Sequence, residues 1–409
     1  MAQQPFLKSI RPVNLLSFGP NTEEIELRRE LNILIGPNGS GKSNLIEILG
    51  LLRNLTEKKP WGHITETGGV KEWVWKDTKQ RVSSNTPSRS ALDVVSTVYS
   101  DEEMEYAYQI RLATYDWSTT FSIENEGIQP HPISSKRLEP HEAISRENDR
   151  VVYWPLEERG SSSDGLNSQR AQVTDQISIL SLPLGIVGAN ALAHDLFQRI
   201  ALYRNWTFGF KSSPRTLEQA GKENTYLEEE SGNLAHVLNF LLTHPTPEPG
   251  QKLLEAFKKF CGDVEDIQTR VQEGFVQLRV REISGISIPA IRLSDGTLRW
   301  LALLTILLNP TPAPVTCIDE PELGLHPDVI PTLADLLVDA AKRTQLIVTT
   351  HSSALIDAFS DDPEAVCICE KVEGSTVIRR LDKNRLKVWL KDYSLGHLWA
   401  SGEIGGNRW

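Results

Sequence analysis

The segment "LNILIGPNGSGKSNLIEILGLL" constrains the fold of this chain more than any other part of the sequence. The apolar run that begins at Leu31 is typical of a buried strand, and apolar residues recur at helical spacing after Lys42. The turn between them fits the pattern G-x-x-x-x-G-K-[ST], with Gly36, Gly41, Lys42 and Ser43 in the required places. Since a strand, a glycine-rich turn and a helix are the context this pattern needs, we predict a phosphate-binding loop. The alternative is a chance glycine loop.

The predicted loop has a direct chemical use. Its glycines let successive backbone N–H groups turn toward phosphate oxygens, and the following helix adds its positive N-terminal end. Lys42 can reach the β- and γ-phosphates of a nucleotide, and the Ser43 hydroxyl can bind Mg²⁺. We therefore expect ATP and Mg²⁺ as cofactors. The residues expected to hold them in this loop are Gly36, Asn38, Gly39, Ser40, Gly41, Lys42, Ser43 and Asn44.

Two adjacent acids end another predicted strand, in "VTCIDEPELGLHP". The tip of a strand in a parallel sheet is where such sheets bind ligands, so Asp319 is expected to hold Mg²⁺. Glu320, which points the other way, can orient and deprotonate an attacking water. The alternative is a solvated helix cap, because acids are favoured at helix N-termini.

A histidine ends the next predicted strand, in "QLIVTTHSSALID". At that position His351 can hydrogen-bond the γ-phosphate or the attacking water. A lone histidine is often only structural, but its place one strand after the acid pair favours a role in catalysis.

The stretch "LSDGTLRWLALLTIL" adds a second helix start with donors aimed outward. Ser294 can cap this helix, and Asp295 and Gly296 complete the turn. Because the chain already has its own phosphate loop, a second donor set is explained if it serves the ATP of another subunit. Two chains, head to tail across a two-fold axis, would bury two ATP molecules. An ordinary helix cap without a partner is the alternative.

In this order the four segments resemble the ABC-type ATPases. More closely they resemble the RecF/SMC-like and OLD-like branch, whose members include AAA-type predicted ATPases. The resemblance covers roughly residues 5–55 and 285–370. It implies that "LSDGT" is the signature motif acting in trans, that Glu320 is the catalytic glutamate and His351 the switch histidine, and that "ELGLHP" is the D-loop region. The chain departs from the family in its Q-loop glutamine, for which Gln80 is a weak candidate.

The predicted fold is α/β: an ABC-type P-loop nucleotide-binding lobe built from both ends of the chain, with an antiparallel β-subdomain and a helical insertion. No long coiled coil is expected, since no heptad pattern is sustained. We divide the chain into residues 1–135 (phosphate loop and antiparallel strands), 136–284 (a loop and a mainly helical insertion) and 285–409 (signature, acid pair and His351).

Composition sets further limits. The chain has 409 residues, a net charge of −11 and 4 cysteines, and shows neither a secretory signal nor an apolar run long enough to span a membrane. A cytoplasmic location without membrane attachment is expected. The charge does not favour a protein that wraps nucleic acid. Two stretches, "LYRNWTFGFKSSPR" and "RRLDKNRLKVWLK", nevertheless interleave basic and aromatic residues and could contact nucleic acid; a solvated face is the alternative.

These observations predict an ATPase that closes as a head-to-tail dimer, or a higher even oligomer, around two ATP molecules. No second acid cluster suggests a nuclease, so the resemblance implies a separate Toprim or HNH nuclease subunit, as in anti-phage systems. Two alternatives stay open. One is a DNA-repair ATPase that binds DNA directly, and the other is a scaffold that binds ATP without hydrolysing it.

Overall fold

The computed structural model describes residues 5–76, 88–99, 103–115, 118–131, 144–147, 150–153, 169–172, 174–182, 189–204 and 206–405. The chain divides into two compact units, each assembled from separate segments of the sequence. The first unit comprises Met1–Arg29, Gly36–Ile200 and Ile368–Arg379, and the second comprises Glu30–Ile35, Ala201–Cys367 and Arg380–Trp409. The chain passes from the second unit to the first directly before Gly36, at the start of the predicted phosphate loop.

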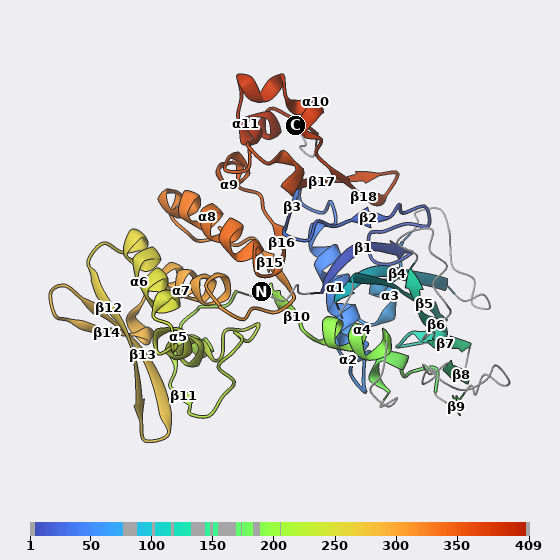
Figure 1. Cartoon of the computed structure of the whole chain (residues 1–409), viewed down its shortest axis with the longest axis horizontal. Coiled ribbons are helices and arrows are strands. Elements are labelled where there is room, and N and C mark those ends of the chain that lie inside the picture. Colours follow the sequence, from blue (N-terminus) through green and yellow to red (C-terminus); the bar gives the residue numbers. More distant parts are fainter. Residues whose placement is uncertain are drawn as a thin grey trace. The chain divides into compact units, whose positions relative to one another are not determined.

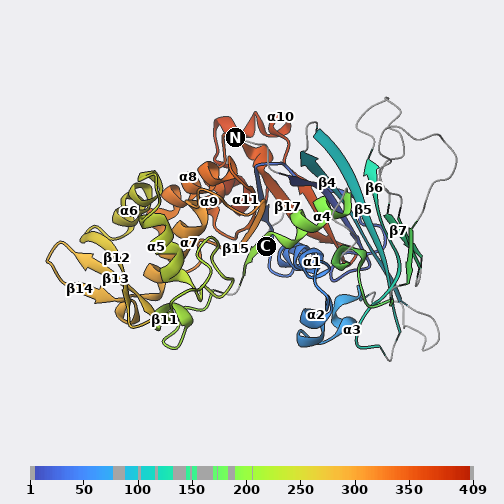
Figure 2. The ribbon, with the colours of Figure 1, turned by 60° about the horizontal axis from the view of Figure 1, so that its bottom comes forward.

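An antiparallel sheet dominates the first unit. Its eight strands lie in the order β2-β1-β4-β5-β6-β7-β8-β9. Their bounds are β1 (Phe6–Val13), β2 (Ile25–Glu26), β4 (Ser88–Tyr99), β5 (Glu103–Thr114), β6 (Ser122–His131), β7 (Ile144–Glu147), β8 (Arg150–Tyr153) and β9 (Gln169–Gln172). Figure 2 shows the long strands β4, β5 and β6 side by side, with α4 (Ala189–Gln198) close to them.

Helices accompany this sheet in the first unit. They are α1 (Lys42–Asn54), α2 (Gly62–Glu66), α3 (Val70–Trp73) and the 3₁₀ turn η1 (Ile179–Ser181). Most of α1 is buried, because apolar residues occupy most positions from Leu45 to Leu52. A buried helix of this kind holds the preceding loop in a fixed place, which is what a phosphate-binding loop requires.

The second unit is built around parallel strands. Its strands β10 (Ile200–Tyr203), β15 (Val315–Asp319), β16 (Gln345–Thr349) and β3 (Leu31–Ile35) lie side by side in that order. All five residues of β3 and of β16 are buried, as expected of central strands covered on both faces. The strand β17 (Val366–Val372) begins beside β3 and continues into the first unit, where β18 (Ser375–Arg380) is its neighbour.

Helices and a small sheet complete the second unit (Figure 1). The helices are α5 (Leu234–Leu242), α6 (Glu248–Phe260), α7 (Asp295–Leu307), α8 (Ile330–Ala341), α9 (Ser353–Asp357), α10 (Lys383–Leu386) and α11 (Leu395–Ala400). The small sheet holds β11 (Glu218–Gln219), β13 (Phe275–Glu282), β12 (Val264–Gln272) and β14 (Ser287–Pro289). The 3₁₀ turns are η2 (Ser213–Arg215), η3 (Ala290–Arg292), η4 (Pro327–Val329), η5 (Pro363–Ala365) and η6 (Trp389–Lys391).

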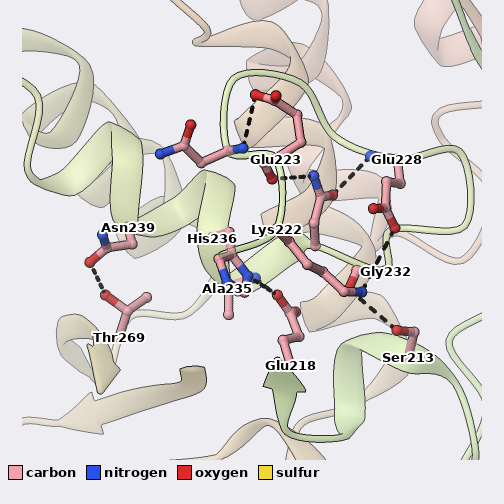
Figure 3. A network of polar contacts seen from close by, with 12 residues as sticks. Ser213, Glu218, Lys222, Glu223, Glu228, Gly232, Ala235, His236, Asn239 and Thr269 are labelled. Carbon is pink, nitrogen blue, oxygen red and sulfur yellow. Dashed lines mark hydrogen bonds and ion pairs between the residues drawn. The ribbon is translucent and has the colours of Figure 1, made fainter. Parts of the chain in front are cut away.

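A polar network holds the connection between β11 and α5 (Figure 3). The buried carboxylate of Glu218 accepts a hydrogen bond from Ala235 N at 2.9 Å and lies 2.7 Å from Nδ1 of His236. Burial raises the pKa of Glu218, and these hydrogen bonds oppose the increase. Nearby, Lys222 Nζ donates to Gly232 O at 2.8 Å. Side-chain bonds therefore fix a connection that has little regular secondary structure of its own.

The structure confirms the predicted fold class, and it differs from the sequence-based expectation in one region. Residues 136–284 were expected to be a loop and then mainly helices. The described part of that range contains the helices α4, α5 and α6 together with the strands β7 to β13, and β7 to β9 extend the antiparallel sheet. Strands of four residues are too short to show a period, and a neighbouring strand rather than local sequence stabilises them. The three-part division of the chain stays a prediction.

Two expected absences concern helices. Among the described residues, the longest helices have 13 residues, and no coiled coil is present. No helix of the described part of the chain is long and apolar enough to cross a membrane.

Candidate functional site

The predicted phosphate loop directly precedes α1 in the first unit. The N-cap residue of α1 is Gly41, in the left-handed region with φ 103°, and no side chain caps the helix. Gly41 therefore offers no side-chain acceptor to the N–H groups of the first helical turn. This is the arrangement that binds phosphate at a helix N-terminus.

Two positions of the loop have no room for a side chain, because neighbouring atoms lie too close. A Cβ atom at Gly36 would collide with the carbonyl oxygen of Cys369, and one at Gly41 would collide with Oγ1 of Thr376. Thr376 Oγ1 also donates a hydrogen bond to Ser40 O at 2.8 Å. Thr376 of β18 thus stabilises the loop, and it can lie this close because Gly41 has no side chain.

The polar side chains of the loop fit a phosphate ligand. Lys42 is buried, and its Nζ atom donates to Gly36 O at 2.8 Å and to Pro37 O at 3.2 Å, so the ammonium lies over the loop. The buried Oγ of Ser40 has no hydrogen-bond partner among the described residues. An orphaned hydroxyl beside an uncapped helix start matches an acceptor such as a phosphate oxygen. Asn38, Gly39 and Ser43 are exposed, and Asn44 is half-buried.

The acid pair lies in the second unit, at the end of β15. Asp319 is in parallel register with Thr349 of β16, and Thr349 is in register with Leu34 of β3. The carboxyl ends of these three strands are therefore level with one another. Thr349 Oγ1 donates to Asp319 Oδ1, and Glu320 N donates to Thr349 O at 3.1 Å. The residues that follow these three positions therefore lie at the same edge of the sheet; they are Glu320, Thr350 and Ile35.

His351 lies beside the second acid. Its Nε2 atom is 3.6 Å from Oε1 of Glu320, and both side chains are about one-third exposed. Its backbone N–H donates to Oε1 of Glu322 at 3.1 Å, and Thr350 Oγ1 donates to the same oxygen at 2.6 Å. Burial raises the pKa of Glu322, and these two hydrogen bonds lower it in part. The Glu322 carboxylate thus fixes the backbone that presents His351 to Glu320.

The signature-like turn begins α7 in the same unit. Ser294 is the N-cap residue, with Oγ accepting from Thr297 N at 3.1 Å. Ser294 and Asp295 are exposed, and Gly296 lies so close to Gly324 that a Cβ atom would stand 3.0 Å from the Gly324 carbonyl oxygen. The serine acts as a helix cap within its own chain, and its exposure leaves the turn accessible to another molecule.

Three side chains that the sequence did not single out for this site support it. Trp206 Nε1 donates to Asp319 O at 3.0 Å, and Arg299 Nη2 donates to Glu320 O at 2.8 Å. Arg215 is buried and forms an ion pair with Asp295. Arg215 belongs to the stretch "LYRNWTFGFKSSPR", which the sequence offers as a contact for nucleic acid, and its burial in hydrogen bonds to the protein argues against that role. No local pattern marks these contacts, since the partners lie far apart in the sequence.

The second unit thus brings together Asp319, Glu320 and His351, and places Ser294 to Gly296 at an exposed helix start. The loop from Gly36 to Ser43 belongs to the first unit and follows β3 without an intervening residue. Gln80 lies outside the described residues. Within the described residues, no three His, Cys, Asp or Glu side chains group as a metal site formed by protein ligands alone.

Comparison with known proteins gives one family match. Residues 31–164 and 242–357 match the family described as "AAA domain, putative AbiEii toxin, Type IV TA system", and these ranges together make up more than half of the chain. None of the curated proteins matches.

Solved structures of SMC heads are similar to the chain. The crystal structure of the SMC head bound to the C-winged helix domain of ScpA is 13% identical with a TM-score of 0.53, and the match covers 93% of this chain and 99% of that chain. The SMC head with an extended coiled coil, bound to the C-terminal domain of ScpA from Pyrococcus furiosus, is 14% identical with a TM-score of 0.53, covering 95% and 99%. At these identities the likeness shows the fold alone, which is that of an ABC-type ATPase head.

Proposed function

Because the chain belongs to the family described as "AAA domain, putative AbiEii toxin, Type IV TA system" and has the fold of an SMC-type ATPase head, we propose that it hydrolyses ATP in a Mg²⁺-dependent reaction. The observation that carries the proposal is the pairing of Glu320 with His351 at the end of parallel strands, one of whose neighbours leads directly into the phosphate loop.

The residues divide the work by chemistry. Lys42 and the loop N–H groups bind the phosphates, while the Ser43 hydroxyl and the Asp319 carboxylate are the oxygen ligands that Mg²⁺ prefers. Bound Mg-ATP supplies the γ-phosphoryl group and the charge neutralisation. Glu320, which is partly exposed, accepts the proton of an attacking water. Glu322 fixes the backbone of His351, and the His351 ring can donate an N–H group to the same attacking water or to the γ-phosphate.

The signature-like turn supports a dimeric reaction. Ser294, Asp295 and Gly296 stand at an exposed helix start, whose N–H groups suit a phosphate of a second chain's ATP. We propose that two chains close head to tail around two ATP molecules, each bound by the phosphate loop of one chain and the Ser294 turn of the other. Such a contact is self-complementary, as a two-fold dimer requires.

The test is the solution mass of Glu320→Gln with and without Mg-ATP. The expected result is a monomer that becomes a dimer with Mg-ATP, and loss of that dimer in Glu320→Gln/Ser294→Arg. The second change also removes a helix cap, which costs about 1 kcal/mol. Ser394 caps α11 in the same way, accepting from His397 N, so Glu320→Gln/Ser394→Arg is the matched control and should still dimerise. Two results contradict the proposed dimer. One is a solution mass that does not change when Mg-ATP is added, and the other is an equal loss of dimer in the Ser294→Arg and Ser394→Arg variants.

The output of the cycle is proposed to be nucleic-acid-directed, through a separate Toprim or HNH nuclease subunit in anti-phage defence. The family description names a putative toxin of a Type IV toxin–antitoxin system, and the nuclease and the defence role come from the resemblance given above. Purification of the native complex tests it, and a complex without a nuclease contradicts it. DNA-stimulated ATP turnover by the lone protein, falling steeply with salt, would instead favour direct DNA binding.

One surface of the second unit supports contact with nucleic acid. Lys383, Arg385, Lys387 and Lys391 are exposed, as is Trp389, whose ring lies 6.4 Å from that of Tyr393. Exposed aromatic faces among cations suit base stacking and phosphate contacts. Loss of single-stranded DNA binding in Lys387→Glu/Lys391→Glu, measured by fluorescence anisotropy, tests this surface. Binding equal to that of the unchanged protein contradicts it.

A further inference from the structure

The backbone carbonyl groups of Asp319 and Glu320 are held by side chains from elsewhere in the second unit. Trp206 Nε1 donates to the carbonyl oxygen of Asp319, and Arg299 Nη2 donates to that of Glu320. Trp206 follows β10, and Arg299 lies on α7, so neither belongs to the strand that carries the acids. Each acid therefore has its own side-chain donor.

These two donors also contact each other. The guanidinium carbon of Arg299 lies 5.0 Å from the centroid of the Trp206 ring, a cation–π geometry. The same ring stacks with Tyr203 at 6.3 Å and with Phe208 at 6.1 Å, in both cases with an interplanar angle of 29°. Arg299 is 7% exposed, so the contact is shielded from water. The contact between Trp206 and Arg299 thus joins the two side chains that hold the carbonyl groups of Asp319 and Glu320.

The backbone at Glu320 needs such a support. Its φ is 46°, in the left-handed region that non-glycine residues rarely adopt, and such a conformation persists only where the surroundings hold it. Glu320 N donates to both the carbonyl and the hydroxyl oxygen of Thr349, and Arg299 holds the carbonyl on the other side. The orientation of the Glu320 side chain depends on these hydrogen bonds, because they fix the backbone to which the side chain is attached.

The same segment reaches the signature-like turn. Arg215 Nε donates to Phe208 O at 2.7 Å, and its Nη1 donates to Leu293 O at 2.6 Å. The Arg215 guanidinium also pairs with Asp295, which lies one helical turn before Arg299 on α7. The segment Trp206–Arg215 is therefore hydrogen-bonded to the end of β15 through its first residue and to the start of α7 through its last.

We propose that Trp206 and Arg299 are positioning residues, which orient Asp319 for Mg²⁺ and Glu320 for proton transfer, and that the segment Trp206–Arg215 couples this orientation to the turn at Ser294. The proposal rests on the ATPase function proposed above. Contact of that turn with a second chain's nucleotide would then be transmitted to the acids of its own chain through Arg215, Phe208 and Trp206.

Trp206→Phe is the sharpest test, because it keeps an aromatic ring at this position and removes the N–H donor. We expect kcat to fall about tenfold or more, since small displacements of catalytic groups have large kinetic effects. The KM for ATP and the thermal midpoint should change little, because the phosphate loop and the aromatic stack remain. Arg299→Lys, which retains one donor, should fall between the unchanged protein and Arg299→Met. Phe210→Ala, at a side chain 76% exposed in the same segment, is the control and should have no effect.

A second measurement does not depend on turnover. The affinity for a fluorescent ATP analogue is measured with Mg²⁺ and with EDTA, and the ratio reports how well Asp319 is placed for the metal. We expect the gain from Mg²⁺ to be reduced in Trp206→Phe and unchanged in Phe210→Ala. If the unchanged protein shows Mg²⁺-dependent binding or turnover and Trp206→Phe matches it in kcat and in this ratio, the positioning role is wrong while the proposed ATPase stands. If the unchanged protein shows neither, both proposals are wrong.

Discussion

Nε2 of His351 lies 3.6 Å from Oε1 of Glu320, at the ends of two neighbouring parallel strands. This distance lets the two side chains act on one water or phosphate oxygen between them after a small adjustment. Neither side chain is buried, so a substrate can reach both. The pair is the most specific geometric support for hydrolysis in the second unit, and it leads to the first prediction.

Glu320→Gln should lower kcat for ATP hydrolysis by about 10²–10⁴-fold, because an amide cannot accept the proton. His351→Ala should have a smaller effect in the same direction. Both variants should still bind ATP, since the phosphate loop is unchanged. Phosphate release with a matched binding assay measures both effects. His244→Ala is the control, because the His244 ring bonds to Thr246 within its own turn and lies outside the segments assigned to the site. If Glu320→Gln hydrolyses ATP as fast as the unchanged protein does, Glu320 is not the base, and a scaffold that does not hydrolyse ATP is excluded as well.

Lys42→Ala should weaken ATP binding by about tenfold or more, because its ammonium lies over the loop at Gly36 and Pro37 and a charge-assisted bond to phosphate is lost. Isothermal titration with Mg-ATP measures the change. Lys58→Ala, at an exposed lysine after the same helix, is the control. Equal affinities of the two variants would mean that the loop does not hold the nucleotide through Lys42.

The stability of the protein should depend on the protonation of Glu322. Burial raises the pKa of this carboxyl group above its ordinary value of 4.5. The unfolded chain therefore loses this proton at lower pH than the folded chain does. The contribution of Glu322 to the free energy of unfolding consequently falls as pH rises from about 4.5 through the raised folded value.

The comparison that isolates this effect uses Glu322→Gln, whose amide oxygen can still accept from Thr350 and His351 and which does not titrate. The urea midpoint of this variant should rise relative to that of the unchanged protein as pH increases from about 4 to 7.5. Parallel midpoints over this range would show that Glu322 does not carry the pH dependence.

Arg215→Met should destabilise the protein by about 2 kcal/mol, since several backbone carbonyl groups lose a donor. It should also abolish ATP-driven dimerisation in the Glu320→Gln background, because the turn before Asp295 is no longer fixed. Urea denaturation and solution mass measure the two effects separately. Lys211→Ala, at an exposed cation of the same segment, should change neither. If Arg215→Met still forms the ATP-driven dimer, the dimer does not require Arg215 to fix the turn at Ser294.

Much of the fold could be predicted because its signals are local. The phosphate loop combines adjacent glycines, a lysine and a serine between a strand and a helix, and the α/β fold class follows from short apolar strands alternating with helices. The strands β7 to β9 were not predicted, because four-residue strands depend on their neighbours for stability.

The candidate site divides in the same way. The sequence by itself determined which segments carry the acids, His351, Ser294 and the phosphate loop, because each stands at a strand or helix end that a local pattern marks. Only the tertiary structure decided that Trp206 and Arg299 hold the carbonyl groups of Asp319 and Glu320, and that Arg215 is buried against the signature-like turn rather than free to bind phosphate. The physical reason is that a hydrogen bond from a side chain to a carbonyl group 113 residues away leaves no pattern in the sequence, since every residue type offers the same acceptor.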